Sequence, residues 1–177
     1  MNAAVIDGPD NASAQAWWFL DALVVEHRRA EEMAGIVLEM TLPVGHAPAL
    51  HVHDTLDDNW YVLQGQMAAR CGDDEFVIEA GSWVSMPRGV PHTFRVVGER
   101  PARILVVHDN STFRDFVREL GARTTEHVPP PTPSFPPMDQ LARVAGNHDL
   151  RPIGPPMTPD EASAIISSRI RAQPRPA

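Results

Sequence analysis

Hydrophobic residues between Trp17 and His108 occur in short runs that turn residues separate. The runs are WWFLDALVV, AGIVLEMTL, NWYVLQ, QMAARC, EFVIEA, SWVSM, HTFRVV and ARILVVH. Glycine, proline and aspartate stand between most of them, and no long helical period interrupts the series. Evenly spaced runs of this kind are typical of strands in a β-sandwich or β-barrel. The pattern therefore predicts an all-β domain.

The pattern changes after His108, where hydrophobic residues recur at helical spacing. These residues are Phe113, Phe116, Val117 and Leu120. They predict an amphipathic helix with Ser111 as its N-cap and Gly121 as its end. Residues 129–137, PPPTPSFPP, cannot join the interior of a sheet and predict an extended surface tether.

Two short helices are expected beyond the tether. One spans about 138–145, and the other begins at the capping box Thr158-Pro159-Asp160-Glu161 and continues to about Arg169. We therefore divide the chain into an N-terminal tail (1–16), a barrel with its following helix (17–121), and a proline-rich tail (122–177). The short helices of that tail are expected to pack on the barrel or on a partner subunit.

Composition narrows the classes of partner. Hydrophobic residues make up 43% of the 177, charged residues 21%, and the formal net charge is −8. The negative charge argues against nucleic acid or an anionic membrane as a partner. Neither a signal peptide nor a run of eighteen apolar residues is present, so a cytoplasmic location is expected.

The candidate chemistry begins with His51 and His53. Residues i and i+2 of a strand share a face, so both imidazoles can point into the barrel. Asp58 follows, and His92 begins another strand after a turn that Gly81, Pro87 and Gly89 define. Neighbouring strands can bring three imidazoles and one carboxylate together, which is a typical set of metal ligands.

These spacings resemble the two motifs of the cupin superfamily. Gly45, His51, His53, Asp58 and Gly65 stand at the positions of the first motif, with Asp where glutamate is usual. Gly81, Pro87, Gly89 and His92 stand at those of the second, with Val96 in place of asparagine. The stretches NWYVLQG, EAGSWVSMPRGVPHTFRV and PARILVVH look most like single-domain quercetin 2,3-dioxygenase-like cupins.

The resemblance implies a jelly-roll barrel, also called a double-stranded β-helix, with short C-terminal helices. It also implies a homodimer and one divalent transition metal held by His51, His53, Asp58 and His92. The donor set does not distinguish Fe, Ni, Mn, Co, Cu and Zn.

Asp58 is the informative departure from the motif. Its side chain is one methylene shorter than that of glutamate, about 1.5 Å of bond. Three arrangements are open: the strand moves inward, a water bridges Asp58 to the metal, or three histidines hold the ion alone. Asp57 offers no substitute, because strand alternation points it away from its neighbour.

Alternation along the strands also predicts the substrate pocket. If Asp58 and His92 face inward, so do the residues two and four positions further along their strands. This rule gives Trp60, Val62, Phe94 and Val96, and further candidates from other strands include Met67 and Val106. The expected pocket residues are Trp60, Val62, Met67, Phe94 and Val106. His46 is expected to be a loop residue, and His108 a hydrogen-bonded or exposed strand end, with a pocket role as the alternative.

Three functions are open. The first is a dioxygenase in which O2 reacts with a flavonol-like or other enolic aromatic substrate and Asp58 acts as ligand, base or both. The second is a non-oxidative isomerase, cyclase or lyase with Asp58 as general base. The third is a barrel that binds a small molecule without chemistry.

Overall fold

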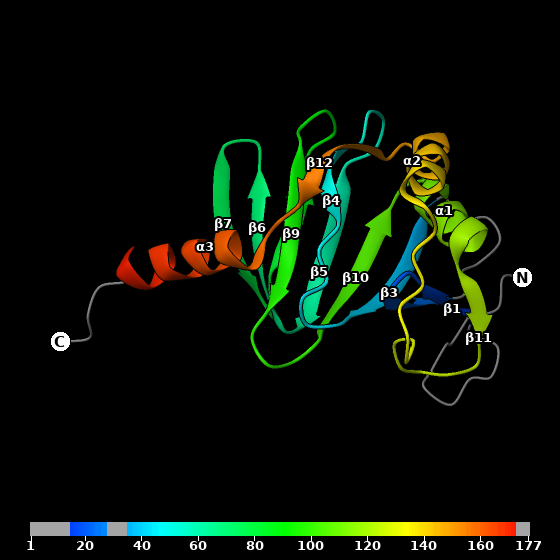
Figure 1. Ribbon diagram of the computed structural model, residues 1–177, viewed down its shortest axis with the longest axis horizontal. Coiled ribbons are helices and arrows are strands. Elements are labelled where there is room, and N and C mark those ends of the chain that lie inside the picture. The colour runs from blue at the N-terminus through cyan, green and yellow to red at the C-terminus, as the bar shows by residue number, and fades with distance from the viewer. Residues whose placement is uncertain (1–14, 28–34, 173–177) are drawn as a thin grey trace, which may run out of the picture.

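The computed structural model describes residues 15–27 and 35–172, and their strands form two antiparallel sheets that pack face to face (Figure 1). The strands of the larger sheet, in chain order, are β1 (Gln15–Phe19), β2 (Ala22–Glu26), β3 (Ile36–Leu42), β5 (Asp58–Gln64), β8 (Trp83–Met86), β10 (Ala102–His108) and β11 (Ala122–Thr124). Those of the smaller sheet are β4 (Ala49–Val52), β6 (Gln66–Cys71), β7 (Asp74–Glu79), β9 (His92–Val97) and β12 (Arg151–Pro156). The all-β jelly-roll prediction is confirmed.

The strand order shows how the chain winds through both sheets. Side by side, the larger sheet runs β11-β1-β2-β3-β10-β5-β8 and the smaller runs β12-β4-β9-β6-β7. β4 and β5 follow one another in the chain but belong to different sheets, as do β8 and β9. The candidate site residues therefore come from both sheets: His51 on β4 and His92 on β9 belong to the smaller sheet, and Asp58 on β5 belongs to the larger one.

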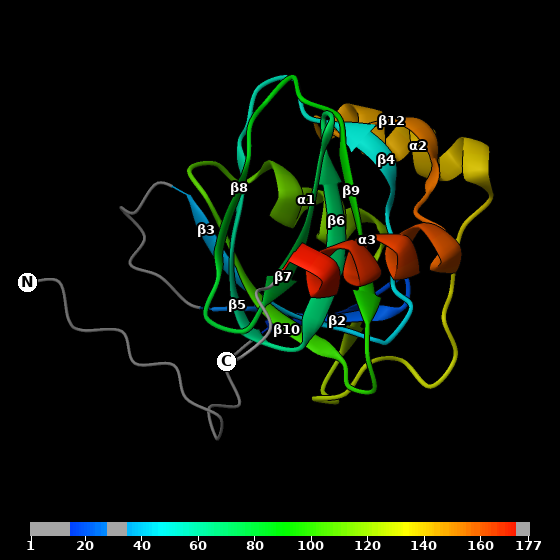
Figure 2. The ribbon, with the colours of Figure 1, turned by 90° about the vertical axis from the view of Figure 1, so that its left-hand side faces the viewer.

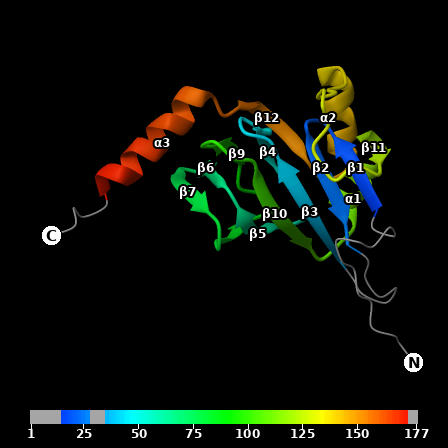
Figure 3. The ribbon, with the colours of Figure 1, turned by 90° about the horizontal axis from the view of Figure 1, so that it is seen from below.

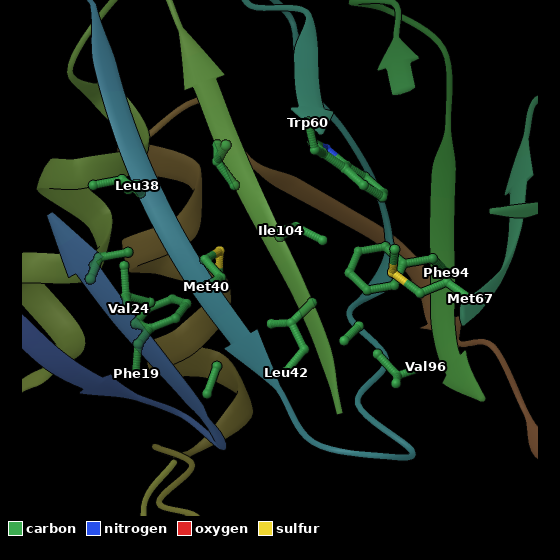
Figure 4. Close-up of a cluster of buried hydrophobic side chains, with 14 of the residues drawn as sticks. Phe19, Val24, Leu38, Met40, Leu42, Trp60, Met67, Phe94, Val96 and Ile104 are labelled. Atoms are coloured by element: carbon green, nitrogen blue, oxygen red, sulfur yellow. The ribbon is translucent and has the colours of Figure 1, made fainter. Parts of the chain in front are cut away.

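The hydrophobic core fills the space between the two sheets. Figure 4 shows side chains from β3 and β10, such as Met40 and Ile104, on one side of this space, with Phe94 of β9 opposite them. Along β5 the burial alternates as predicted: Trp60 and Val62 are buried, whereas Tyr61 between them is exposed. Period-two burial of this kind fixes the register, because a one-residue slip would turn Trp60 to solvent.

The first apolar run forms two strands and not one. WWFLDALVV folds into the hairpin of β1 and β2, with the turn at Leu20 and Asp21. Leu20 adopts a φ of 60°, which is unusual for a leucine. The predicted N-terminal tail, 1–16, lies outside the described residues except for Gln15 and Ala16, which already belong to β1.

The predicted helices form close to their expected places. They are α1 (Thr112–Leu120), α2 (Met138–Asn147) and α3 (Pro159–Ala172). The capping box of α3 is present, because the Thr158 hydroxyl and amide both donate to the Glu161 carboxylate, at 2.9 and 2.7 Å. α3 lies against β6 and β7, as Figure 2 shows, and buries Ile165 in a small separate core. None of the described helices has the length and apolar character to cross a bilayer.

The strand β12 was not expected. Its sequence, RPIGPP, contains three prolines, yet it pairs with β4 at the edge of the smaller sheet. Proline is tolerated there because an edge strand leaves one row of amides unpaired, and the register shifts twice along the pair. Figure 3 shows β12 running from the α2 end of the molecule toward α3. The C-terminal tail thus adds a strand to the barrel, directly beside the strand that carries His51.

Candidate metal centre

Strand pairing brings the three motif histidines together. His51 on β4 lies directly opposite His92 on β9, and their ring centroids are 4.4 Å apart. His53, one residue beyond the end of β4, lies 5.1 Å from His51 and 5.5 Å from His92 between centroids. All three rings are buried, so the cluster is shielded from bulk water.

Each ring is fixed by a hydrogen bond from Nδ1 to a backbone carbonyl. The acceptors are Ala49 O for His51 at 2.8 Å, Asp149 O for His53 at 2.6 Å, and Val90 O for His92 at 2.9 Å. Because a carbonyl only accepts, each Nδ1 must carry the hydrogen, and each neutral ring keeps a lone pair on Nε2. This is how metal-binding histidines are usually held in proteins.

Asp58 completes the cluster from the opposite sheet. Its Oδ2 lies 3.8 Å from His92 Nε2, too far for a hydrogen bond, and His92 Nε2 has no hydrogen-bond partner among the described residues. A buried nitrogen without a partner is costly unless something fills the gap. An unpartnered imidazole nitrogen and a carboxylate oxygen at this separation are suited to share a cation.

The spacing of the donor atoms fits a metal ion. One ligand atom from each of His51, His53, Asp58 and His92 can be chosen so that all four lie within 4.8 Å of one another. Ligands at about 2.2 Å from one ion lie at most about 4.4 Å apart, so binding needs shifts of only a few tenths of an ångström. The 3.8 Å between Asp58 Oδ2 and His92 Nε2 falls inside that limit. The shorter side chain of Asp58 therefore does not place it out of range.

Burial and mutual charge set the protonation of the cluster. Burial lowers the pKa of His51 to about 4, and the neighbouring His92 adds to the effect. Burial likewise lowers the pKa of His53. For Asp58, burial alone would raise the pKa, but the hydrogen bond from His108 and the nearby imidazoles hold it well below its usual range. His51 and His53 are therefore neutral and Asp58 is ionised near pH 7, as metal ligands must be.

His108 belongs to the site, although sequence reasoning left it as a strand end. It is buried, and its Nε2 donates to Asp58 Oδ1 at 2.9 Å. That bond leaves Asp58 Oδ2 turned toward His92. The signal was available in the sequence, because His108 stands two positions after Val106 on one strand, and Val106 was an expected pocket residue.

Asp149, which the sequence did not single out, supports the loop that carries His53. Besides accepting the His53 bond at its carbonyl, its carboxylate accepts from the amides of Asp54, Thr55 and Leu56 at 3.0, 3.0 and 3.2 Å. The Thr55 hydroxyl donates to it as well, at 2.7 Å. Asp149 has a φ of 59°, so its backbone is held in a conformation that few residues adopt. One residue of the C-terminal tail thus positions a ring of the cluster.

Asp57, in contrast, faces away from the cluster, as alternation predicted. Its carboxylate binds Arg88 through the backbone amide at 2.9 Å and the guanidinium at 3.0 and 3.1 Å. It therefore fixes the turn before β9 and offers no donor to a metal.

A cavity of about 440 Å³ opens beside the cluster, with His51, His53 and Asp58 on its wall. Its other walls are mostly apolar and include Phe19, Met40, Leu42, Ile104, Phe113 and Phe135. Of the predicted pocket residues, Trp60, Phe94 and Val106 line it. Val62 and Met67 do not line it and instead pack within the core between the sheets. Alternation identified which side chains turn inward but not how deep the core packing reaches.

Known proteins show the same kind of domain. Residues 38–108 match the family model described as Cupin domain. The uncharacterized protein MJ1618 of Methanocaldococcus jannaschii is 30% identical over 67 residues, which are 38% of this chain and 54% of that protein. The chain therefore matches about half of the length of this curated relative.

Solved structures with a similar fold include the cupin domain of Schizosaccharomyces pombe Cnp3. It is 16% identical, with a TM-score of 0.46 over 58% of this chain and 74% of that one. Lactobacillus farciminis oxalate decarboxylase is 19% identical, with a TM-score of 0.46 over 55% of this chain and 31% of that one.

Removing the Asp149 carboxylate should weaken metal binding. Asp149→Gly keeps the positive φ accessible but frees the 54–56 amides, so we expect a 10- to 100-fold lower affinity for Zn²⁺ by competition with a chelating dye. Asp149→Asn tolerates the same backbone and keeps one acceptor oxygen, and should lose less. An unchanged affinity in a folded Asp149→Gly protein would show that the loop does not depend on this residue.

The metal-free protein should lose stability in mild acid. The pKa of His51 is about 4 when folded and 6.5 when exposed, so between these values the unfolded chain binds more protons. The free energy of unfolding should therefore fall as pH drops from about 6.5 to 4, by up to about 1.4 kcal/mol per pH unit for one group. Denaturant titrations should show a shallower slope for His51→Gln, and equal slopes would contradict the assignment.

Proposed function

We propose, on the premise that residues 38–108 are a cupin domain with a buried cluster able to hold a metal, that the protein is a metal-dependent dioxygenase. Its substrate would be a flat, largely apolar molecule with an enolic hydroxyl, of which a flavonol is one example. The observation that carries the proposal is a cluster of three imidazoles and one ionised carboxylate, of which His51, His53 and Asp58 lie on the wall of a mostly apolar cavity.

The residues that would hold the metal are His51, His53, His92 and Asp58. A divalent ion bound there would supply the positive charge that lowers the pKa of an enol hydroxyl. Three neutral imidazoles and one carboxylate leave one of the two positive charges of a divalent ion uncompensated, which favours an anionic oxygen ligand.

Asp58 is suited to take the proton of that hydroxyl. It lies at the cavity wall with Oδ1 held by His108, so the proton would go to Oδ2, the oxygen that faces the cluster. Its lowered pKa makes it a weak base on its own, and it can act only on a hydroxyl that has been acidified. His108 stabilises the charged form and keeps the carboxylate in place.

The apolar walls orient the substrate and exclude water. Trp60 and Phe94 present neighbouring aromatic faces, with ring centroids 4.9 Å apart. Flat rings pack well against such surfaces. A dry cavity also strengthens the electrostatic interactions at the cluster and protects a reactive enolate from protonation by water.

Oxygen consumption tests the proposal. Protein loaded in turn with Fe²⁺, Ni²⁺, Mn²⁺, Co²⁺, Cu²⁺ or Zn²⁺ should consume O2 with quercetin or another flavonol, and chelation should abolish the activity. Asp58→Asn should lower kcat by about 100-fold or more, because the proton acceptor is lost. Asp57→Asn is the matched control, since it changes the adjacent carboxylate outside the site. Absence of oxygen uptake with every metal and enol would reject the dioxygenase.

One observation favours a second candidate. The hydrogen bond between Asp58 and His108 forms a carboxylate–imidazole pair that can pass a proton within the site without O2. A non-oxidative isomerase, cyclase or lyase in the same cavity would use that pair as its base. A barrel that only binds a small molecule would need neither the pair nor a metal.

Anaerobic assays separate these candidates. Turnover of an enolic substrate without O2 should persist in a non-oxidative enzyme and drop about 100-fold in His108→Leu, which removes the proton-carrying partner. A strict requirement for O2 would exclude this second candidate.

The expected homodimer stays a prediction, to be tested by the mass of the protein in solution.

A further inference from the structure

A second polar pair lies on the wall of the same cavity, apart from the metal cluster. His46 Nδ1 and Asp21 Oδ1 are 2.7 Å apart, and both residues line the cavity. Their side chains are only 12% and 16% exposed, so the pair is largely withdrawn from solvent. Asp21 comes from the turn between β1 and β2, and His46 from the loop between β3 and β4.

Backbone pairing places this pair far from the metal cluster. The Gly45 amide donates to Val96 O at 3.0 Å, and the Val96 amide donates to His46 O at 2.9 Å. His46 therefore lies beside Val96, four residues along β9 from His92, which is roughly 13 Å of strand. Between them the wall is aromatic: the Phe94 ring lies 5.7 Å from the His46 ring and 4.9 Å from Trp60.

The hydrogen bond leaves the other ring nitrogen of His46 available. A carboxylate only accepts, so Nδ1 carries the hydrogen, and in the neutral form of the ring Nε2 keeps a lone pair. Within residues 15–27 and 35–172, Nε2 has no hydrogen-bond partner. It is not among the side-chain nitrogens that are fully buried without a partner. Arg95, another charged group on the wall, is engaged with Met157 O at 3.2 Å.

We propose that His46, oriented by Asp21, is a second ligand-binding group that accepts a hydrogen bond from a hydroxyl at the far end of the substrate. The ligand class is then narrower than a flat apolar molecule. It is an elongated aromatic compound with one oxygen group at the metal cluster, an apolar middle against Phe94 and Trp60, and a phenolic hydroxyl at His46. Only the placement of the first end rests on the proposed function.

The pair could instead serve only to hold two loops together. A structural pair would affect stability but would not distinguish a ligand with a hydroxyl from one without. Ligand discrimination is therefore the measurement that separates the two roles.

The test compares 4-phenylphenol with biphenyl, which differ by one hydroxyl. Dissociation constants are measured by calorimetry on the full chain, with and without added Zn²⁺. We expect wild-type protein to prefer the phenol by about tenfold in both conditions, because one buried hydrogen bond is gained. In His46→Phe the preference should fall to about onefold while biphenyl still binds.

Asp21→Asn should reduce the preference without abolishing it, because the ring loses its charged partner. Glu119→Gln is the matched control. It removes the carboxylate from the His148–Glu119 pair, whose 2.7 Å contact lies outside the cavity lining, and should leave the preference unchanged.

The proposal is overturned by no preference in wild-type protein, by a preference that survives in His46→Phe, or by no binding of either probe. A preference that appears only with Zn²⁺ would report the hydroxyl at the metal cluster and would overturn it as well. A negative oxygen-uptake assay has no bearing on this comparison, so the two ideas fail separately.

Discussion

Three hydrogen bonds from imidazole Nδ1 to backbone carbonyls determine what this barrel can do. They give His51, His53 and His92 a lone pair on Nε2, while the pairing of β4 with β9 sets the rings 4.4 to 5.5 Å apart. Without these bonds the imidazole rings could flip or rotate. The Nε2 atoms would then no longer be fixed in their positions facing Asp58. The candidate metal site is therefore a property of backbone pairing as much as of side-chain identity.

The surroundings of Asp58 accommodate an aspartate at the motif position where glutamate is usual. A shorter carboxylate reaches less far, yet β5 places its Oδ2 3.8 Å from His92 Nε2 while Oδ1 is held by His108. Burial alone would make the charged form of Asp58 unfavourable, and the hydrogen bond from His108 offsets that cost. Asp58 and His108 thus act together, and a substitution at either changes the environment of the other.

The cavity joins two polar sites through an apolar passage. The metal cluster lies at one end of β9 and the His46–Asp21 pair lies near the other, with Phe94 between them. In a mostly apolar pocket the few polar groups fix the orientation of a ligand. Positions on β9 at spacing two thus supply a member of the histidine cluster in His92, an aromatic surface in Phe94 and the backbone contact of His46 in Val96.

The sequence by itself determined the class of fold and most of the inward-facing residues. Alternation along a strand is a local property, so the inward positions of Trp60, Phe94 and Val106 could be read from spacing, as could the capping box before α3. The grouping of His51, His53, Asp58 and His92 came from motif spacing together with family resemblance, and the structure brings these residues together.

Only the tertiary structure decided which distant segments meet. His108 joins Asp58 because β10 pairs with β5, and Asp149 supports His53 because a proline-rich strand from the tail pairs with β4. His46 becomes a cavity residue through its contact with a turn 25 positions earlier. No local period encodes these contacts, because they depend on how two sheets close on each other, and the same closure placed Val62 and Met67 in the core.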